Sequence, residues 1–444
     1  MSGPGAGAPA VLGQRLLLAL DDFFGAAGLL SVPILYRFRG PLDRAALGRA
    51  LDRVADRQEG LRTTFTRSGR RQVHEHTLPP GVHVPIHETG VAGLVEADRL
   101  IGERLSGGFD LGGLPLTVDL YRHGEDDHVL LINVHHVVTD GWSNMVIRRD
   151  LGRLYSAETG ATVEELPPVD FTLRDYYAWR DARLAGNAGR RHAEYWDRQA
   201  PRLKWSGLRP RTERFGERRP LARVVGLSFD AGQVAALRAV AAQDRATLFA
   251  VLLALLFGVL YAATGSTGLV VGSVFANRLR PEVWNTVGPL ANLAYIRADL
   301  PDRPTFRDLL RAARDGALEA MAHQDYPNVN VLTHRGTTPR IVSRASEVVF
   351  NMLAVPDQVE VPGAVDFHRL AVEPLPFPAG LSSHFDLELV ITPRPQGLDG
   401  ALRWADGRYP PELVTALAEA YQQLAATVVR DPDVPLSSLL KGSF

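Results

Sequence analysis

A hydrophobic strand that runs directly into a polar loop and then a helix constrains this chain more than any other local feature. Residues 129–134 read Val-Leu-Leu-Ile-Asn-Val, which predicts a buried strand, and residues 142–151 have the pattern of a helix. The loop between them, 135–141, reads His-His-Val-Val-Thr-Asp-Gly. Rigid scaffolds often carry reactive groups on such strand-end loops, and an imidazole can accept a proton near neutral pH. The loop is therefore the first candidate for an active site.

Strands and helices alternate along the rest of the chain, which indicates an α/β (α+β) sandwich rather than an all-β domain. In the first half, the patterns predict strands at 32–38, 62–65, 72–76 and 116–121 and helices at 44–55 and 94–105. In the second half, they predict strands at 224–229, 269–274, 347–353 and 385–392 and helices at 231–243, 247–264, 306–324 and 411–429. Residues 158–168 and 206–220 have the composition of a linker and a loop.

Charge and cysteine content exclude several function classes. The net charge is -1, without a long run of one sign, which argues against nucleic-acid binding and against a membrane-surface role. The chain has no cysteine, so disulfides, thiolate zinc sites and a cysteine nucleophile are excluded. If a thioester takes part in the chemistry, its sulfur must come from another molecule.

Membrane and metal alternatives are weak. Residues 248–263 are almost wholly apolar but fall short of the roughly 20 residues of a spanning helix, so a buried core helix is expected. No signal peptide is evident at the amino terminus, and a cytoplasmic location is expected. Four histidines lie close together in sequence, but their spacing fits no standard zinc pattern, and no metal is expected. They are His74, His76, His83 and His87.

Several further motifs follow one another in an order that resembles the condensation domains of nonribosomal peptide synthesis. His135 to Ser143 is similar to that family's active-site motif, HHxxxDG, and the other matches extend over nearly the whole chain. They are Gln14-Arg15-Leu16-Leu17, Arg57 to Phe65, Asp175 to Trp179, Ala276-Asn277-Arg278, Val287 to Asn292 and His323 to Pro327. Four positions depart from the family pattern. The tryptophan that usually follows Leu16 is missing, Gln58 stands where histidine is common, Thr139 where serine is frequent, and Leu290 where phenylalanine is usual.

The resemblance implies two chloramphenicol-acetyltransferase-like lobes that form a V-shaped pseudo-dimer, with an active-site tunnel between them. Residues 1–170 would form the amino-terminal lobe, which carries the HHxxxDG motif, and residues 171–444 the carboxy-terminal lobe. The end of the chain soon after the last expected helix favours a free-standing protein, and a monomer is expected.

The resemblance also implies a reaction and its partners. An acyl group held as a thioester on the phosphopantetheine arm of a carrier protein would pass to an amine, or alternatively to an alcohol, to give an amide or an ester. No permanently bound cofactor is implied. His136 and Gly141 would be catalytic, His136 as the general base or as the group that positions the amine.

Other residues of the motifs would support this chemistry. His135, Asp140 and Arg278 would hold the active site in shape, with Asp140 paired to Arg278. Trp142, Ser143 and Asn292 are candidates for the lining of the tunnel.

Three alternatives share part of this pattern. An epimerisation-type domain shares the HHxxxDG motif, although its other motifs are not evident. An acyltransferase that uses coenzyme A often carries a DFGWG-like segment, which the sequence lacks. A non-catalytic domain that recruits partner enzymes usually has a damaged active-site motif, whereas this one is intact.

Overall fold

The computed structural model describes residues 8–11, 13–15, 17–19, 30–68, 72–203, 208, 222–327, 331, 348–352, 367–375 and 385–438. The chain divides into two compact units. Unit 1 comprises Met1–Ala182, Ala276–Ala291 and Val355–Ser382, and unit 2 comprises Arg183–Phe275, Asn292–Ala354 and Ser383–Phe444. The lobes expected at 1–170 and 171–444, their V-shaped arrangement and the tunnel stay predictions.

Unit 1 is built on a five-stranded sheet with the order β12-β2-β7-β6-β5. Its strands are β2 (Ser31–Arg39), β5 (Ile86–Gly90), β6 (Leu116–Arg122), β7 (Asp127–His135) and β12 (Ala371–Pro374). Neighbouring strands are antiparallel except for β5 and β6. β12 comes from far along the sequence and adds to the edge of β2. The strand that precedes the histidine loop, β7, is therefore central in its sheet.

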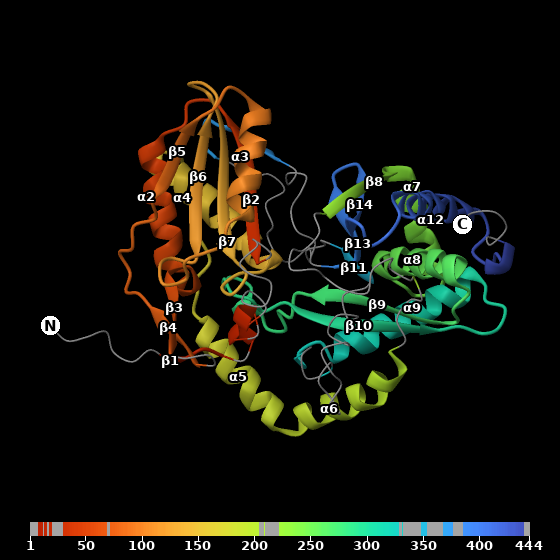
Figure 1. Ribbon diagram of the computed structural model, residues 1–444. Helices are drawn as coiled ribbons and strands as arrows, with labels where there is room; N and C mark the ends of the chain where they lie inside the picture. Colours follow the sequence, from red (N-terminus) through yellow and green to blue (C-terminus); the bar gives the residue numbers. More distant parts are fainter. Residues whose placement is uncertain are drawn as a thin grey trace. The chain divides into compact units, whose positions relative to one another are not determined.

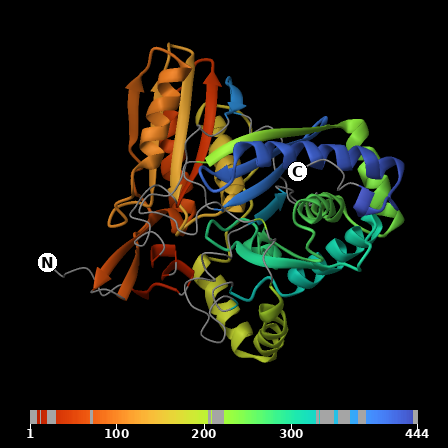
Figure 2. The ribbon, with the colours of Figure 1, turned by 45° about the vertical axis from the view of Figure 1, so that its right-hand side comes forward.

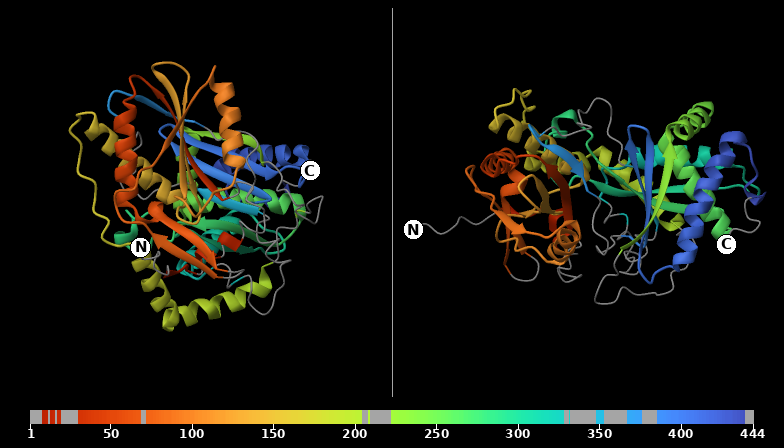
Figure 3. Two further views of the ribbon diagram at one scale, coloured as in Figure 1. Left: turned by 60° about the vertical axis from the view of Figure 1, so that its left-hand side comes forward. Right: turned by 90° about the horizontal axis from the view of Figure 1, so that it is seen from above.

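Both faces of β7 are covered, and its side chains alternate between two cores. Leu130, Ile132 and Val134 face the larger core, whose helices are α2 (Arg44–Arg57) and α4 (Gly141–Glu158). The alternate positions Val129 and Leu131 face α3 (Leu94–Ser106). Figures 1 and 3 show α2 and α3 on opposite sides of this sheet. The near-continuous apolar run of β7 follows from burial on both sides.

A smaller sheet in unit 1 has the order β1-β4-β3. Its strands are β1 (Ala8–Pro9), β3 (Thr63–Ser68) and β4 (Gln72–Thr77), and all pairs are antiparallel. A 3-10 turn, η1 (Glu59–Arg62), links α2 to β3, and α5 (Leu173–Ala185) follows the long connection after α4. His74 and His76 lie on β4, whereas His87 lies on β5 of the other sheet. The strands expected at 62–65 and 72–76 are confirmed as an antiparallel pair.

Unit 2 contains a six-stranded sheet with the order β10-β9-β11-β13-β14-β8. Its strands are β8 (Ala222–Asp230), β9 (Gly268–Phe275), β10 (Asn292–Asp299), β11 (Val348–Met352), β13 (Leu387–Arg394) and β14 (Gly397–Ala405). Its helices are α6 (Asn187–Gln199), α7 (Ala231–Gln243), α8 (Leu248–Thr264), α9 (Phe306–Ala322) and α12 (Pro411–Arg430). Figure 2 shows α12 running beside β8. The expected loop 206–220 lies almost entirely outside the described residues.

The apolar segment expected as a core helix is α8, and it is buried in the core of unit 2. Thr247 caps its start by accepting from the Ala250 N–H, and Gly265 ends it in the left-handed region at φ 66°. Within the described ranges, no single helix has the length and hydropathy of a membrane span; α7 and α8 would pass that test only together, across a bend of 94°. The prediction of a buried core helix is confirmed.

Candidate active site

The histidine loop leaves the carboxyl end of β7 and enters α4 within unit 1. The His135 N–H donates to the Pro115 carbonyl and the His136 N–H to the Leu30 carbonyl, at 2.8 and 2.7 Å. Asp140 is the N-cap of α4, where its side chain accepts from the Ser143 N–H. The loop is therefore fixed at both ends, by backbone contacts at the strand and by a cap at the helix.

His136 is the one partly exposed residue of the run 135–140; the others are buried. Its ring Nδ1 lies 2.6 Å from the backbone carbonyl oxygen of Thr139. A carbonyl can only accept, so Nδ1 carries the proton of the neutral ring and Nε2 keeps its lone pair. The local backbone thus selects the tautomer in which Nε2 can accept a proton from a nucleophile.

His135 is buried and lies on the face of β7 that carries α3. Its Nδ1 accepts from the Val137 N–H at 3.0 Å, and Phe109 packs against its ring edge to face, with centroids 5.1 Å apart. These contacts hold the turn after β7, and the structural role of His135 in the active site stays a prediction. The two adjacent histidines therefore have different surroundings.

The Asp140 carboxylate is 1% exposed and accepts from five donor groups. Oδ1 accepts from the Ser143 N–H, the Ser143 hydroxyl and Nη2 of Arg278, at 2.7, 2.7 and 3.1 Å. Oδ2 accepts from the backbone N–H groups of Leu290 and Ala291, both at 3.0 Å. Its lone pairs are used inside unit 1, so the carboxylate can shape the loop but has no free oxygen for a substrate.

Arg278 completes this network from the segment Ala276–Ala291, which belongs to unit 1. Its Nη1 donates to the carbonyls of Val283 and Thr286 at 2.7 and 2.6 Å, and its Nη2 also donates to the Ser143 hydroxyl at 2.9 Å. The ion pair expected between Asp140 and Arg278 is present, at 3.1 Å, with both side chains almost fully buried. Buried ion pairs of this kind depend on such additional hydrogen bonds.

The remaining predicted residues have separate surroundings. Trp142 is buried and donates from Nε1 to the Trp284 carbonyl at 2.9 Å. Ser143 is fully buried within the Asp140 network. Asn292 belongs to unit 2, where its Nδ2 donates to the Gln324 and Tyr326 carbonyls, both at 2.7 Å. Their place in a tunnel lining stays a prediction.

Gly141 is exposed, and a Cβ added there would meet no atom of the described residues within 4 Å. Its φ is not among the positive values found in the described part of the chain. Neither backbone conformation nor internal packing therefore requires glycine at the start of α4. The open side of this residue leaves room for something outside the fold.

Sequence reasoning noted Gln58 as a departure but did not assign it a role. Its side chain is buried, donates from Nε2 to the Asn285 carbonyl at 2.9 Å and accepts at Oε1 from the Val287 N–H at 3.0 Å. Sequence reasoning also missed the ion pair between the buried Asp150 and the partly exposed Arg57, at 2.9 Å. The available sequence signal was Asp150, a charged residue beside Leu151 in the predicted helix. Both contacts strengthen the frame around the histidine loop.

Comparison with known proteins identifies the family of this chain. The family model described as "Condensation domain" matches residues 8–441. The surfactin synthase subunit 1 of Bacillus subtilis (strain 168) is 28% identical over 96% of this chain, which spans 12% of that relative's length. The enniatin synthase of Fusarium equiseti is likewise 28% identical over 96% of this chain, which spans 14% of its length. The chain therefore corresponds to a small part of each of these relatives.

Solved structures match over almost the whole chain as well. The X-domain from teicoplanin biosynthesis matches with a TM-score of 0.80 and 25% identity, over 98% of both chains. The first condensation domain of the CDA synthetase has a TM-score of 0.78 and 20% identity, over 97% of this chain and 98% of that one. The expected mixed α/β fold, of the chloramphenicol-acetyltransferase type, is confirmed, with open sheets in the described residues.

Proposed function

Because this chain belongs to the condensation-domain family, we propose that it is an acyltransferase that joins a carrier-bound acyl group to an amine. The observation that carries the proposal is the ring of His136, which is partly exposed and held by the Thr139 carbonyl in the tautomer with a free Nε2. An alcohol acceptor, which would give an ester, is the variant of the same reaction.

The reaction forms one bond and breaks another. The acceptor nitrogen attacks the thioester carbonyl, a tetrahedral intermediate forms, and the carbon–sulfur bond breaks. The proton lost by the nitrogen passes to Nε2 of His136 and then to the departing sulfur of the phosphopantetheine arm. General-base assistance of this kind contributes about 10²- to 10⁴-fold in rate, and positioning of the two reactants adds to it.

Gly141 and the buried network have different parts in this proposal. The Gly141 N–H is the first of the free N–H groups at the start of α4, and it can donate to the oxygen of the intermediate. His135, Asp140 and Arg278 hold the loop in place without contacting substrate. Of the residues expected in the tunnel lining, Trp142 and Asn292 keep that role in the proposal, whereas Ser143 is fully buried in the Asp140 network and supports the loop instead.

The test uses a carrier protein loaded with an acyl group, an amine acceptor, and the wild-type and His136→Ala proteins. We expect product formation to fall at least 100-fold in the variant, with its circular dichroism and melting temperature unchanged. His136→Gln is a second variant that keeps the side-chain size. Unchanged product formation by both variants would exclude His136 as the catalytic group.

The proposal also names the partners and setting of the reaction. A carrier protein presents the acyl group, the acceptor is either free or carrier-bound, and the chain acts as a monomer in the cytoplasm. Size-exclusion chromatography with light scattering, with and without the carrier protein, tests the oligomeric state. A stable dimer at micromolar concentration would contradict it.

A second candidate function is recruitment of another enzyme without catalysis. It is favoured by the likeness to the X-domain, whose complex with OxyB has been solved, with a TM-score of 0.79 for that chain. The intact His136 and Gly141 favour catalysis instead. If the wild-type protein gives no product with any loaded carrier but binds a partner enzyme stably, recruitment is the better description.

A further inference from the structure

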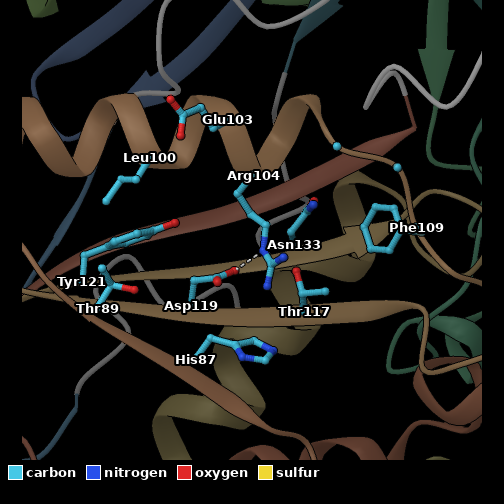
Figure 4. Close-up of a pocket in the computed structure, with 12 residues that line it drawn as sticks. His87, Thr89, Leu100, Glu103, Arg104, Phe109, Thr117, Asp119, Tyr121 and Asn133 are labelled. Atoms are coloured by element: carbon cyan, nitrogen blue, oxygen red, sulfur yellow. Dashed lines mark hydrogen bonds and ion pairs between the residues drawn. The ribbon is translucent and has the colours of Figure 1, made fainter.

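A cavity of about 460 Å³ lies in unit 1, on the face of the five-stranded sheet that carries α3. α3 packs against residues of β2, β6 and β7 on this face. Beside the helix, side chains of β5, β6 and β7 face the cavity (Figure 4). This volume is within the usual range for a small-molecule site.

The floor of the cavity follows from the register of the strands. Thr117 on β6 lies opposite Asn133 on β7, and His87 on β5 lies beside Asp119 on β6. From the helix above, Arg104 donates from Nε to Oδ2 of Asp119 at 2.8 Å. Figure 4 shows this pair at the middle of the cavity, with Thr117 and Asn133 between it and Phe109.

Asn133 is the feature that points to a ligand. Its side chain is 2% exposed, and its Nδ2 donates to the Ser31 hydroxyl at 3.3 Å. Among the described residues, its Oδ1 has no hydrogen-bond partner, and neither does the hydroxyl of Thr117 opposite it. Buried polar atoms in native proteins are almost always satisfied. Two adjacent exceptions that line the same cavity indicate a place for a hydrogen-bonding ligand.

The other groups around the cavity define the chemistry of this ligand. Arg104 offers its two terminal NH₂ groups, for which no acceptor occurs in the described part of the chain. Burial, followed by the Asp119 charge, raises the pKa of Tyr121 to about 12, so its phenol stays an O–H donor. The Asp119 carboxylate would repel an anionic ligand, and the Arg104 guanidinium would repel a cationic one. A neutral group with one donor and one acceptor fits both.

We propose that this cavity binds a neutral amide, with the amide N–H on Oδ1 of Asn133 and the carbonyl on Arg104. Phe109 supplies an apolar wall at the same end and contacts the ring of His135. The cavity therefore lies next to the histidine loop. The assignment of this cavity to an aminoacyl or peptidyl part of the substrate rests on the proposed function. The binding of an amide in the cavity does not.

A matched pair of small probes tests the assignment. N-benzylacetamide carries one N–H, one carbonyl and one ring, and benzyl acetate differs only by oxygen in place of the N–H. We expect the wild-type protein to bind the amide at least fivefold more tightly than the ester in a ligand-observed NMR titration. A site built around a hydrogen bond discriminates against an analogue that lacks the donor.

Asn133→Leu removes the acceptor and keeps the side-chain size. We expect it to weaken amide binding about tenfold, which is the usual scale for a buried hydrogen bond, and to leave ester binding unchanged. Thr117→Val is the second variant if Asn133→Leu does not fold. Asn187→Leu, on the exposed surface of α6, is the control and should leave amide binding unchanged.

Equal affinity for amide and ester, or an unchanged amide affinity in both cavity variants, would overturn the assignment. The two proposals fail separately. A protein that binds the amide through Asn133 but forms no product with loaded carriers contradicts the condensation function alone. Product formation without selective amide binding contradicts only the cavity assignment, and His136→Ala should leave amide binding intact.

Discussion

Two buried aspartates, one in each unit, hold their surroundings together by different means. Asp140 in unit 1 is surrounded by a guanidinium, a hydroxyl and three backbone N–H groups. Asp325 in unit 2 lies 2.7 Å from Nε of Arg183 and 3.0 Å from Nε2 of His192. The two carboxylates are 1% and 3% exposed. They are alike in burial and differ in which partners can lose or gain a proton.

The partners of Asp140 keep their protons over the whole physiological range, because guanidinium, hydroxyl and amide groups do not titrate there. The partners of Asp325 include the imidazole of His192. The Nδ1 atom of His192 lies 2.8 Å from Nδ1 of His323. Only one ring can donate in that contact, so both rings cannot be protonated. The hydrogen bonds of Asp140 are therefore insensitive to pH near neutrality, whereas the histidine cluster around Asp325 contains groups that titrate.

Removal of the Asp140 charge should have the largest effect on stability. Asp140→Asn leaves Arg278 buried without its anion and turns an NH₂ group toward the N–H of Leu290 and Ala291. The loss should be about 3–5 kcal/mol of unfolding free energy, the usual cost of breaking a buried ion pair. Urea denaturation of the wild type and the variant measures it.

A double variant sharpens this result. Asp140→Asn with Arg278→Met removes both charges, and it should recover part of the loss because no unpaired charge stays buried. If the double variant lost more unfolding free energy than the two single variants together, the ion pair would not be the main stabilising element around the histidine loop.

Asp325→Asn in unit 2 should cost less, about 1–3 kcal/mol, because Arg183 is partly exposed and water can replace its partner. The same denaturation experiment compares it with Asp140→Asn. A loss equal to that of the Asp140 variant would erase the contrast between the two sites.

The sequence predicted most elements and few of their long-range contacts. The helix expected at 231–243 coincides with α7 (Ala231–Gln243), because its start is marked by an Asp230 cap. β14 was not predicted, since Asp399 and Gly400 lower its strand propensity. A Cβ at Gly400 would lie 2.9 Å from Cβ of Leu227 on the neighbouring strand. Glycine is therefore required here by packing against the neighbouring strand, and the local sequence pattern carries no information about that contact.

In the candidate site, too, some contacts could be predicted from the sequence and others could not. Family resemblance paired Asp140 with Arg278, 138 positions apart. The backbone donors of Leu290 and Ala291 and the Gln58 contacts were not foreseen, because Gln58 meets Val287 across 229 positions. Backbone N–H groups have no sequence signature, so such partners become visible only in the folded chain.

Stability of unit 2 should fall in mild acid. Burial, and next the neighbouring His192, lower the pKa of His323 to about 4, below the value of about 6.5 in an unfolded chain. The unfolded state therefore binds more protons between these values, and stability is full above pH 6.5 and is lost as the pH falls toward 4. We expect a loss of about 1–2 kcal/mol, after allowance for partial exposure of the ring.

Unfolding free energies measured from pH 7.5 to 4.5 test this slope. His323→Gln should flatten this pH dependence of the unfolding free energy. An equal slope in wild type and His323→Gln would assign the acid sensitivity to other groups.

Gly141→Ala should have the smallest effect on stability, and in the opposite direction. Because its added Cβ meets no atom within 4 Å in the part of the chain that the structure describes, the variant should gain about 0.4–1 kcal/mol through the unfolded state. Product formation should nevertheless fall if the open side of Gly141 receives the reacting carbonyl. Gly102→Ala, in α3, has equally open space for a Cβ and should gain stability without loss of rate. A Gly141→Ala protein that is more stable and fully active would show that this glycine serves neither folding nor the reaction.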